Sequence, residues 1–190
     1  PVDLAKGNHR LLYDVNNRGG LAMLPRFNLA VGSNDPSGPE HAGNGFLMRQ
    51  GYTMLWSAWN WDVLPGDGRL QIELPIATDN GTPITGRLVS EIVVNQRSAS
   101  EPLAWGNSRC YPAANPEELT AVLTVRDEQR APRQVIPRES WRFARAQAGL
   151  AVPDPTFVWM DGGFEPGRIY ELVYTAKDPR VAGLGLAAIR

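Results

Sequence analysis

The sequence is poor in the residues whose chemistry is most easily recognised. It has a single cysteine, Cys110, so an internal disulfide and a cysteine-based zinc site are excluded. Beside Tyr111 and Pro112, this cysteine is expected to be a small buried apolar group rather than a nucleophile. The histidines, His9 and His41, are too few and too polar in context to indicate a metal cluster. We therefore expect neither a metal nor another cofactor.

An excess of one charge and long hydrophobic runs are also missing. Nineteen basic residues against 20 acidic ones give a formal net charge of −1, which argues against a nucleic-acid-binding protein because such proteins show a basic face. No apolar run approaches the roughly 20 residues of a membrane-spanning helix. Neither nucleic acid nor a membrane is an expected partner.

The first 62 residues predict a β-α-β unit. Residues 10–15 have the composition of a strand and are followed by a turn at residues 16–20 and a long polar loop containing Pro25. A short helix is expected over residues 44–50. Residues 52–59 are nearly continuously apolar, which favours a buried strand of a parallel sheet.

From Trp61 onward the pattern is that of a β-rich module. Residues 69–76 alternate polar with apolar side chains, as a half-buried strand does. Further strands, separated by turns, are expected at residues 86–95, 119–126, 142–146, 156–160 and 167–174. Short strands of this kind are typical of an antiparallel sandwich or barrel.

The last residues predict a helix. Asp178 and Pro179 suit an N-cap and the first helical position, and Val181, Leu184 and Ala188 follow at helical spacing. Because this helix would still be running at Arg190, we interpret the chain as a fragment.

Three stretches, residues 13–19, 43–59 and 167–190, resemble a bacterial group of α/β-hydrolase-domain proteins of mostly uncharacterised function. The resemblance implies an α/β fold with a β-rich insertion. Residues 1–62 would begin an incomplete hydrolase core, residues 63–177 would be an antiparallel insertion serving as a lid or substrate domain, and residues 178–190 would start the next core helix.

The resemblance also implies where catalysis would occur. Such hydrolases carry their serine on a Gly-x-Ser-x-Gly turn, which this sequence lacks, so the catalytic triad would lie outside the chain. The loop after the first strand would supply the oxyanion hole. The candidate residues for that hole are Asn16, Asn17, Arg18, Gly19 and Gly20. From the residues alone, a tight turn with left-handed residues is the favoured interpretation of this loop, and the resemblance makes the two interpretations about equal.

Three tryptophans form a second candidate site. Trp56, Trp59 and Trp61 could line a pocket or stack on a sugar ring, although core packing is the more common role of such residues.

Two functions from different classes follow. The resemblance implies a fragment of a secreted or periplasmic serine-type hydrolase that acts on an ester or related acyl bond of a small molecule. This fragment would be inactive alone and would need the C-terminal half of the hydrolase as its partner. The alternative is a non-catalytic β-rich binding module, directed at carbohydrate through its tryptophans.

Overall fold

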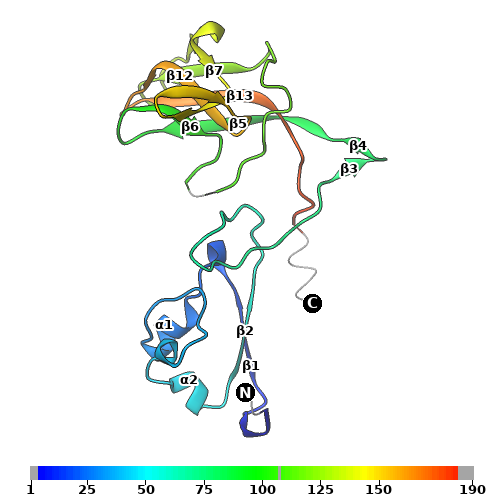
Figure 1. Cartoon of the computed structure of the whole chain (residues 1–190), viewed down its shortest axis with the longest axis vertical. Coiled ribbons are helices and arrows are strands. Elements are labelled where there is room, and N and C mark those ends of the chain that lie inside the picture. The colour runs from blue at the N-terminus through cyan, green and yellow to red at the C-terminus, as the bar shows by residue number, and fades with distance from the viewer. Residues whose placement is uncertain (1–3, 107, 184–190) are drawn as a thin grey trace. The chain divides into compact units, whose positions relative to one another are not determined.

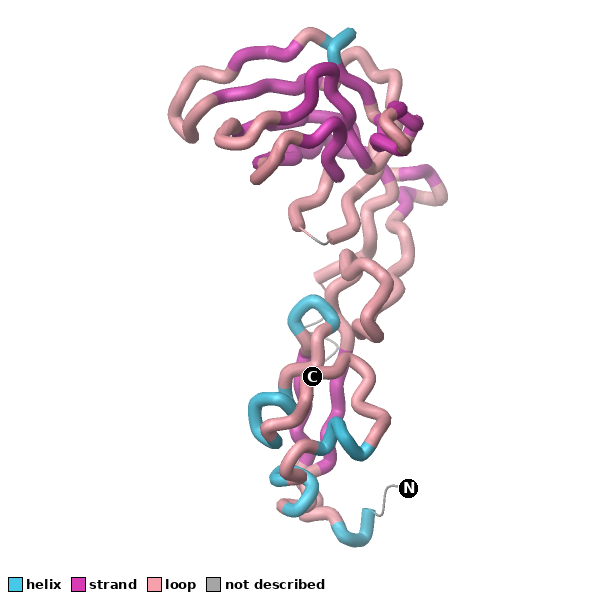
Figure 2. Tube along the Cα trace, turned by 60° about the vertical axis from the view of Figure 1, so that its left-hand side comes forward, coloured by secondary structure: helices cyan, strands magenta, loops and turns pink. Residues whose placement is uncertain are grey.

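The computed structural model describes residues 4–106 and 108–183, which divide into two compact units (Figure 1). Residues 4–74 and 182–183 belong to the first unit, and Pro75–Val181 form the second. In Figure 2 the strands concentrate in the second unit, whereas both α-helices lie in the first. No helix among the described residues is both long enough and apolar enough to cross a membrane.

The first unit contains one parallel strand pair. Strand β1 (Leu11–Val15) pairs with β2 (Thr53–Ser57), with Leu11 opposite Thr53 and Val15 opposite Ser57. The sequence correctly indicated both strands and their parallel neighbourhood. The connection between them includes helices α1 (Met23–Asn28) and α2 (Phe46–Arg49). It also holds the 3₁₀ turns η2 (Asn17–Gly19) and η3 (Pro39–Ala42), while η1 (Leu4–Lys6) precedes β1.

Helix α2 lies within the predicted residues 44–50, whereas α1 replaces part of the predicted loop. Pro25 occupies the first turn of α1, where a missing N–H group breaks no helical hydrogen bond. Met23 and Leu24 are buried, so packing rather than propensity stabilises this short helix.

Asn28 ties the connection together from inside the first unit. Its side chain is fully buried, and its Oδ1 accepts the Leu47 N–H at 3.0 Å while its Nδ2 donates to the Ala42 carbonyl at 2.9 Å. Its backbone carbonyl accepts the Asn44 N–H at 2.7 Å. Asn28 thus provides hydrogen-bond partners for backbone groups of residues 42–47 that lie outside regular helical pairing.

The second unit is antiparallel and has two main sheets. The four-stranded sheet has the order β5 (Thr85–Val93), β13 (Ile169–Lys177), β7 (Val122–Arg126) and β8 (Gln134–Ile136). The three-stranded sheet has the order β6 (Ser98–Pro102), β12 (Phe157–Phe164) and β9 (Trp141–Arg142). The remaining elements are β3 (Thr78–Asp79), β4 (Thr82–Pro83), β10 (Ala144–Gln147), β11 (Leu150–Pro153) and the 3₁₀ turn η4 (Arg138–Ser140).

The core lies between the inner faces of these two sheets. Strand β13 alternates strictly, so that Tyr170, Leu172 and Tyr174 are buried and the residues between them are not. Phe164 of β12 meets Tyr170 edge to face, with ring centroids 4.9 Å apart. Burial of such large apolar side chains stabilises the fold by roughly 1.5–3 kcal/mol each.

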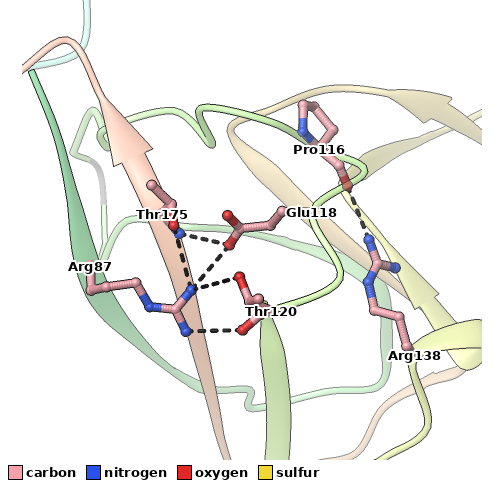
Figure 3. A network of polar contacts seen from close by, with 6 residues as sticks. All are labelled: Arg87, Pro116, Glu118, Thr120, Arg138 and Thr175. Atoms are coloured by element: carbon pink, nitrogen blue, oxygen red, sulfur yellow. Dashed lines mark hydrogen bonds and ion pairs between the residues drawn. The ribbon is translucent and has the colours of Figure 1, made fainter. Parts of the chain in front are cut away.

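Residues 112–114, which precede β7 in the chain, continue the pairing along β13. Polar side chains hold the segment between them and β7 (Figure 3). The Glu118 carboxylate accepts the Thr175 N–H at 2.8 Å and a hydrogen bond from Arg87 at 3.3 Å. Arg87 also donates to the Thr120 carbonyl at 3.0 Å. Arg138 donates to the Pro116 carbonyl at 3.0 Å, so the loop between β6 and β7 is anchored at its second half.

The two ends of the second unit are hydrogen-bonded to one another. Ala77 donates to the Pro179 carbonyl at 2.7 Å, and Val181 donates to the Pro75 carbonyl at 3.0 Å. This bridge is the only regular pairing within residues 69–76, so the strand predicted there is wrong. Leu70, Ile72 and Leu74 are partly buried, and the alternation thus reflects packing of an extended segment.

The predicted α/β fold class is also wrong. The part of the chain that the structure describes is 38% strand and 12% helix, and its sheets are antiparallel apart from the β1–β2 pair. The β-α-β opening does not grow into a hydrolase core because only β1 and β2 pair there, and Leu55 of β2 is 49% exposed instead of covered. The described residues therefore do not form the α/β-hydrolase core that the resemblance implied.

The helix expected from Asp178 is absent from residues 178–183. Asp178 adopts a left-handed conformation with φ of 59°, whereas an N-cap residue is normally extended. The rest of that predicted helix, residues 184–190, lies outside the described residues.

Candidate functional site

The loop predicted to form an oxyanion hole uses its backbone donors internally. Asn16 donates to the Ser57 carbonyl at 3.3 Å, and Gly20 donates to the Asn17 carbonyl at 3.2 Å. The Arg18 N–H is bound by Asn60 Oδ1 at 3.0 Å. Three of the five expected N–H groups are thus already engaged.

Side chains close the same loop. Asn16 is buried and donates from Nδ2 to the Gly20 carbonyl at 3.0 Å, and Arg18 pairs with Asp62 at 2.5 Å. Arg18 and Gly19 have φ of 53° and 71°, and a Cβ on Gly19 would clash with the Leu70 carbonyl oxygen. These contacts favour the tight-turn interpretation, while the oxyanion hole stays an untested prediction.

The three predicted pocket tryptophans also lie in the first unit. Trp56 is opposite Asp14 in the β1–β2 pair and is partly buried, as is Trp61. Trp59 is about half exposed. They line neither of the two cavities described below, both of which belong to the second unit.

The larger of these cavities, of about 360 Å³, lies beside β5 and β6 and is called here the β5–β6 pocket. Its volume falls within the range of small-ligand sites. Its lining consists of Glu91, Ile92, Val93, Glu101, Pro102, Ala104, Trp105 and Gly106. A second cavity, of about 210 Å³, is bordered mainly by apolar groups such as Ile84, Leu88 and Tyr111.

Among the residues that line the β5–β6 pocket, Trp105 is notable because it is a large apolar residue and is 85% exposed. The chain just before it is fixed: Leu103 is buried, donates to the Thr156 carbonyl at 2.9 Å and accepts the Ser90 hydroxyl at 3.0 Å. The indole is therefore presented to solvent at the start of an anchored loop. Tryptophan is enriched at interfaces, because its side chain combines a large apolar surface with one polar N–H group.

Sequence reasoning missed Trp105 in favour of the three tryptophans at positions 56–61. No local pattern marked Trp105, because the strand β6 that precedes it was not predicted from the sequence either.

Carboxylates dominate the charge of the pocket. Glu91 is exposed and lies 3.5 Å from the guanidinium of Arg126, which also lies 3.5 Å from Glu171. A hydrogen bond from Arg133 lowers the pKa of Glu171. Glu101 lines the pocket and has no ion-pair partner among the described residues.

Other reactive side chains have structural surroundings. Burial raises the pKa of Cys110 to about 11, and its Sγ lies 3.6 Å from the Thr156 carbonyl oxygen. The thiol is therefore protonated at neutral pH, in keeping with the expected apolar role.

The side chain of His41 also has a structural role, because it accepts the Gly38 N–H at 3.2 Å at the start of η3. Within residues 4–106 and 108–183, no group of three or more acidic, histidine or cysteine side chains could hold a metal ion.

Comparison with known proteins adds no relative: no protein-family model, curated protein or solved structure matches this chain significantly. The resemblance to the α/β-hydrolase-domain group therefore has no independent support.

Proposed function

We propose that this chain is a β-rich binding module that binds carbohydrate in the β5–β6 pocket. The observation that carries the proposal is the 85% exposed side chain of Trp105 at the edge of that pocket. An indole face is a flat, apolar and rigid surface, which suits the apolar C–H face of a pyranose ring. The backbone beside Trp105 is already held in place, because Leu103 is hydrogen-bonded to Thr156 and Ser90.

The rest of the lining complements a sugar. Val93 and Pro102 offer apolar contact, while the carboxylates of Glu91 and Glu101 accept hydrogen bonds from hydroxyl groups. A site that combines a few polar acceptors with apolar surface gives both orientation and affinity. We do not propose hydrolysis of an acyl bond, because that function was implied by an α/β-hydrolase core and the described residues do not form one.

Affinity electrophoresis of the whole chain in gels containing soluble polysaccharides tests this proposal. We expect retardation of the wild-type chain by at least one polysaccharide. Trp105→Ala should weaken that binding at least about tenfold, which corresponds to roughly 1.4 kcal/mol. Trp59→Ala is the matched control, since Trp59 is an exposed tryptophan of the other unit. An absence of retardation, or equal losses in both variants, would refute the proposal.

A further inference from the structure

The charge of the β5–β6 pocket bears on which sugar it would take. Its lining includes two carboxylates, Glu91 and Glu101, and no lysine or arginine. Resting on the proposed function, we infer that the preferred ligand is a positively charged sugar, an oligosaccharide of unacetylated amino sugars of the glucosamine type.

Neighbouring cations leave this negative charge only partly compensated. Arg126 reaches Glu91 at 3.5 Å, but it is equally close to Glu171 and donates to the Gln129 carbonyl at 2.6 Å. Arg97, at the turn between β5 and β6, is engaged elsewhere, with the Gly162 carbonyl at 3.0 Å and Glu165 at 3.2 Å. Glu101 has no cationic partner in the part of the chain that the structure describes.

An ammonium group satisfies both chemical elements of the pocket. A hydroxyl group and an ammonium group can both donate a charge-assisted hydrogen bond to the Glu101 carboxylate. The ammonium gains more, because the attraction between opposite charges adds to that hydrogen bond. The face of Trp105 also attracts a cation within about 6 Å of the ring centre. An N-acetyl group removes the charge and both of these contributions, and a sugar carboxylate would be repelled.

The test compares oligosaccharides of equal length on the intact chain by isothermal titration calorimetry at about pH 6, where an amine is protonated. The ligands are glucosamine, N-acetylglucosamine and glucose oligomers. We expect the glucosamine oligomer to bind at least about tenfold more tightly than the other two. This preference should decrease as the pH rises through the pKa of the sugar amine.

Two charge-removing variants locate the preference. Glu101→Gln keeps the shape of the side chain and should reduce the preference to about twofold, because the glucosamine oligomer loses the attraction between opposite charges. Glucose-oligomer binding should weaken less, because the amide oxygen still accepts a hydrogen bond from a hydroxyl group. Glu91→Gln should cause a smaller reduction, because Arg126 already offsets part of that charge. Glu73→Gln, at an exposed position of the first unit, is the control for net charge and should change nothing.

The outcomes separate this inference from the proposed function. Binding of all three oligomers with equal affinity would overturn the charge preference and leave carbohydrate binding intact. No binding of any of the three oligomers would overturn the charge preference, and the affinity electrophoresis would separately refute or support the binding of carbohydrate. Binding of a lysine oligomer as tightly as the glucosamine oligomer would also overturn the inference, because it would show recognition of charge without sugar.

Discussion

At the scale of single residues, buried polar groups in this chain mainly connect segments. Asn28 joins three parts of the first unit, and Ser90 fixes the backbone beside the β5–β6 pocket. Such roles could not be predicted, because an asparagine or a serine in a loop has the same sequence signature whether it is buried or solvated. Cys110 was expected to be buried, and it is partly buried against the core of the second unit.

Cys110 is expected to react slowly with iodoacetamide at neutral pH and progressively faster towards about pH 11. Burial disfavours the charged thiolate and raises the pKa of the thiol from 9.0 to about 11. The same shift should lower the free energy of unfolding between these two pH values, because the unfolded chain releases the proton first. Alkylation rates measured by mass spectrometry check the prediction, with the urea-unfolded chain as the reference. Rapid alkylation of the folded chain at pH 7 would contradict it.

At the scale of elements, strict alternation of side chains predicted one strand correctly and another wrongly. The sequence indicated β13 because Tyr170, Leu172 and Tyr174 form an uninterrupted apolar face. The same pattern failed at residues 69–76, since alternation reveals which side chains are covered but not whether a partner strand lies alongside. The six-residue helix α1 was missed because so short a helix depends on tertiary packing.

Replacing Gly163 by alanine should destabilise β12 where its register against β6 shifts. Gly163 has φ of +79°, and an added Cβ would lie 2.9 Å from the Ser98 carbonyl oxygen. We expect a loss of about 2–3 kcal/mol in the free energy of unfolding, measured with urea. Gly162→Ala is the matched control, because Gly162 has φ of +76° but open space around its Cβ position. It should lose only about 1 kcal/mol, and equal losses would show that the contact with Ser98 is unimportant.

At the scale of the whole molecule, local sequence patterns predicted strand neighbours better than fold class. The parallel pairing of β1 and β2 was correctly expected, yet the class was wrong because no local pattern states how many further strands join a pair. The candidate site was missed for a related reason. The exposure of Trp105 depends on where the core of the second unit ends, and that is set by contacts between distant segments.

Amide hydrogen exchange should differ strongly between the two units. Strand β13 is paired on both sides, by β5 and β7, and its inner face is buried, so its amides should exchange slowest. The β1 and β2 amides should exchange much faster, because a two-stranded sheet with exposed Leu11 and Leu55 has little to stabilise it. Mass spectrometry of peptic peptides measures both, and equal protection would contradict the expectation.

The hydrogen bonds from Val181 to Pro75 and from Ala77 to Pro179 have a consequence for how such a chain can change over evolution. They place the first and the last residues of the second unit beside each other. A segment with adjoining ends can be transplanted, shortened or duplicated as a cassette, because the host needs to span only a small gap when it is removed.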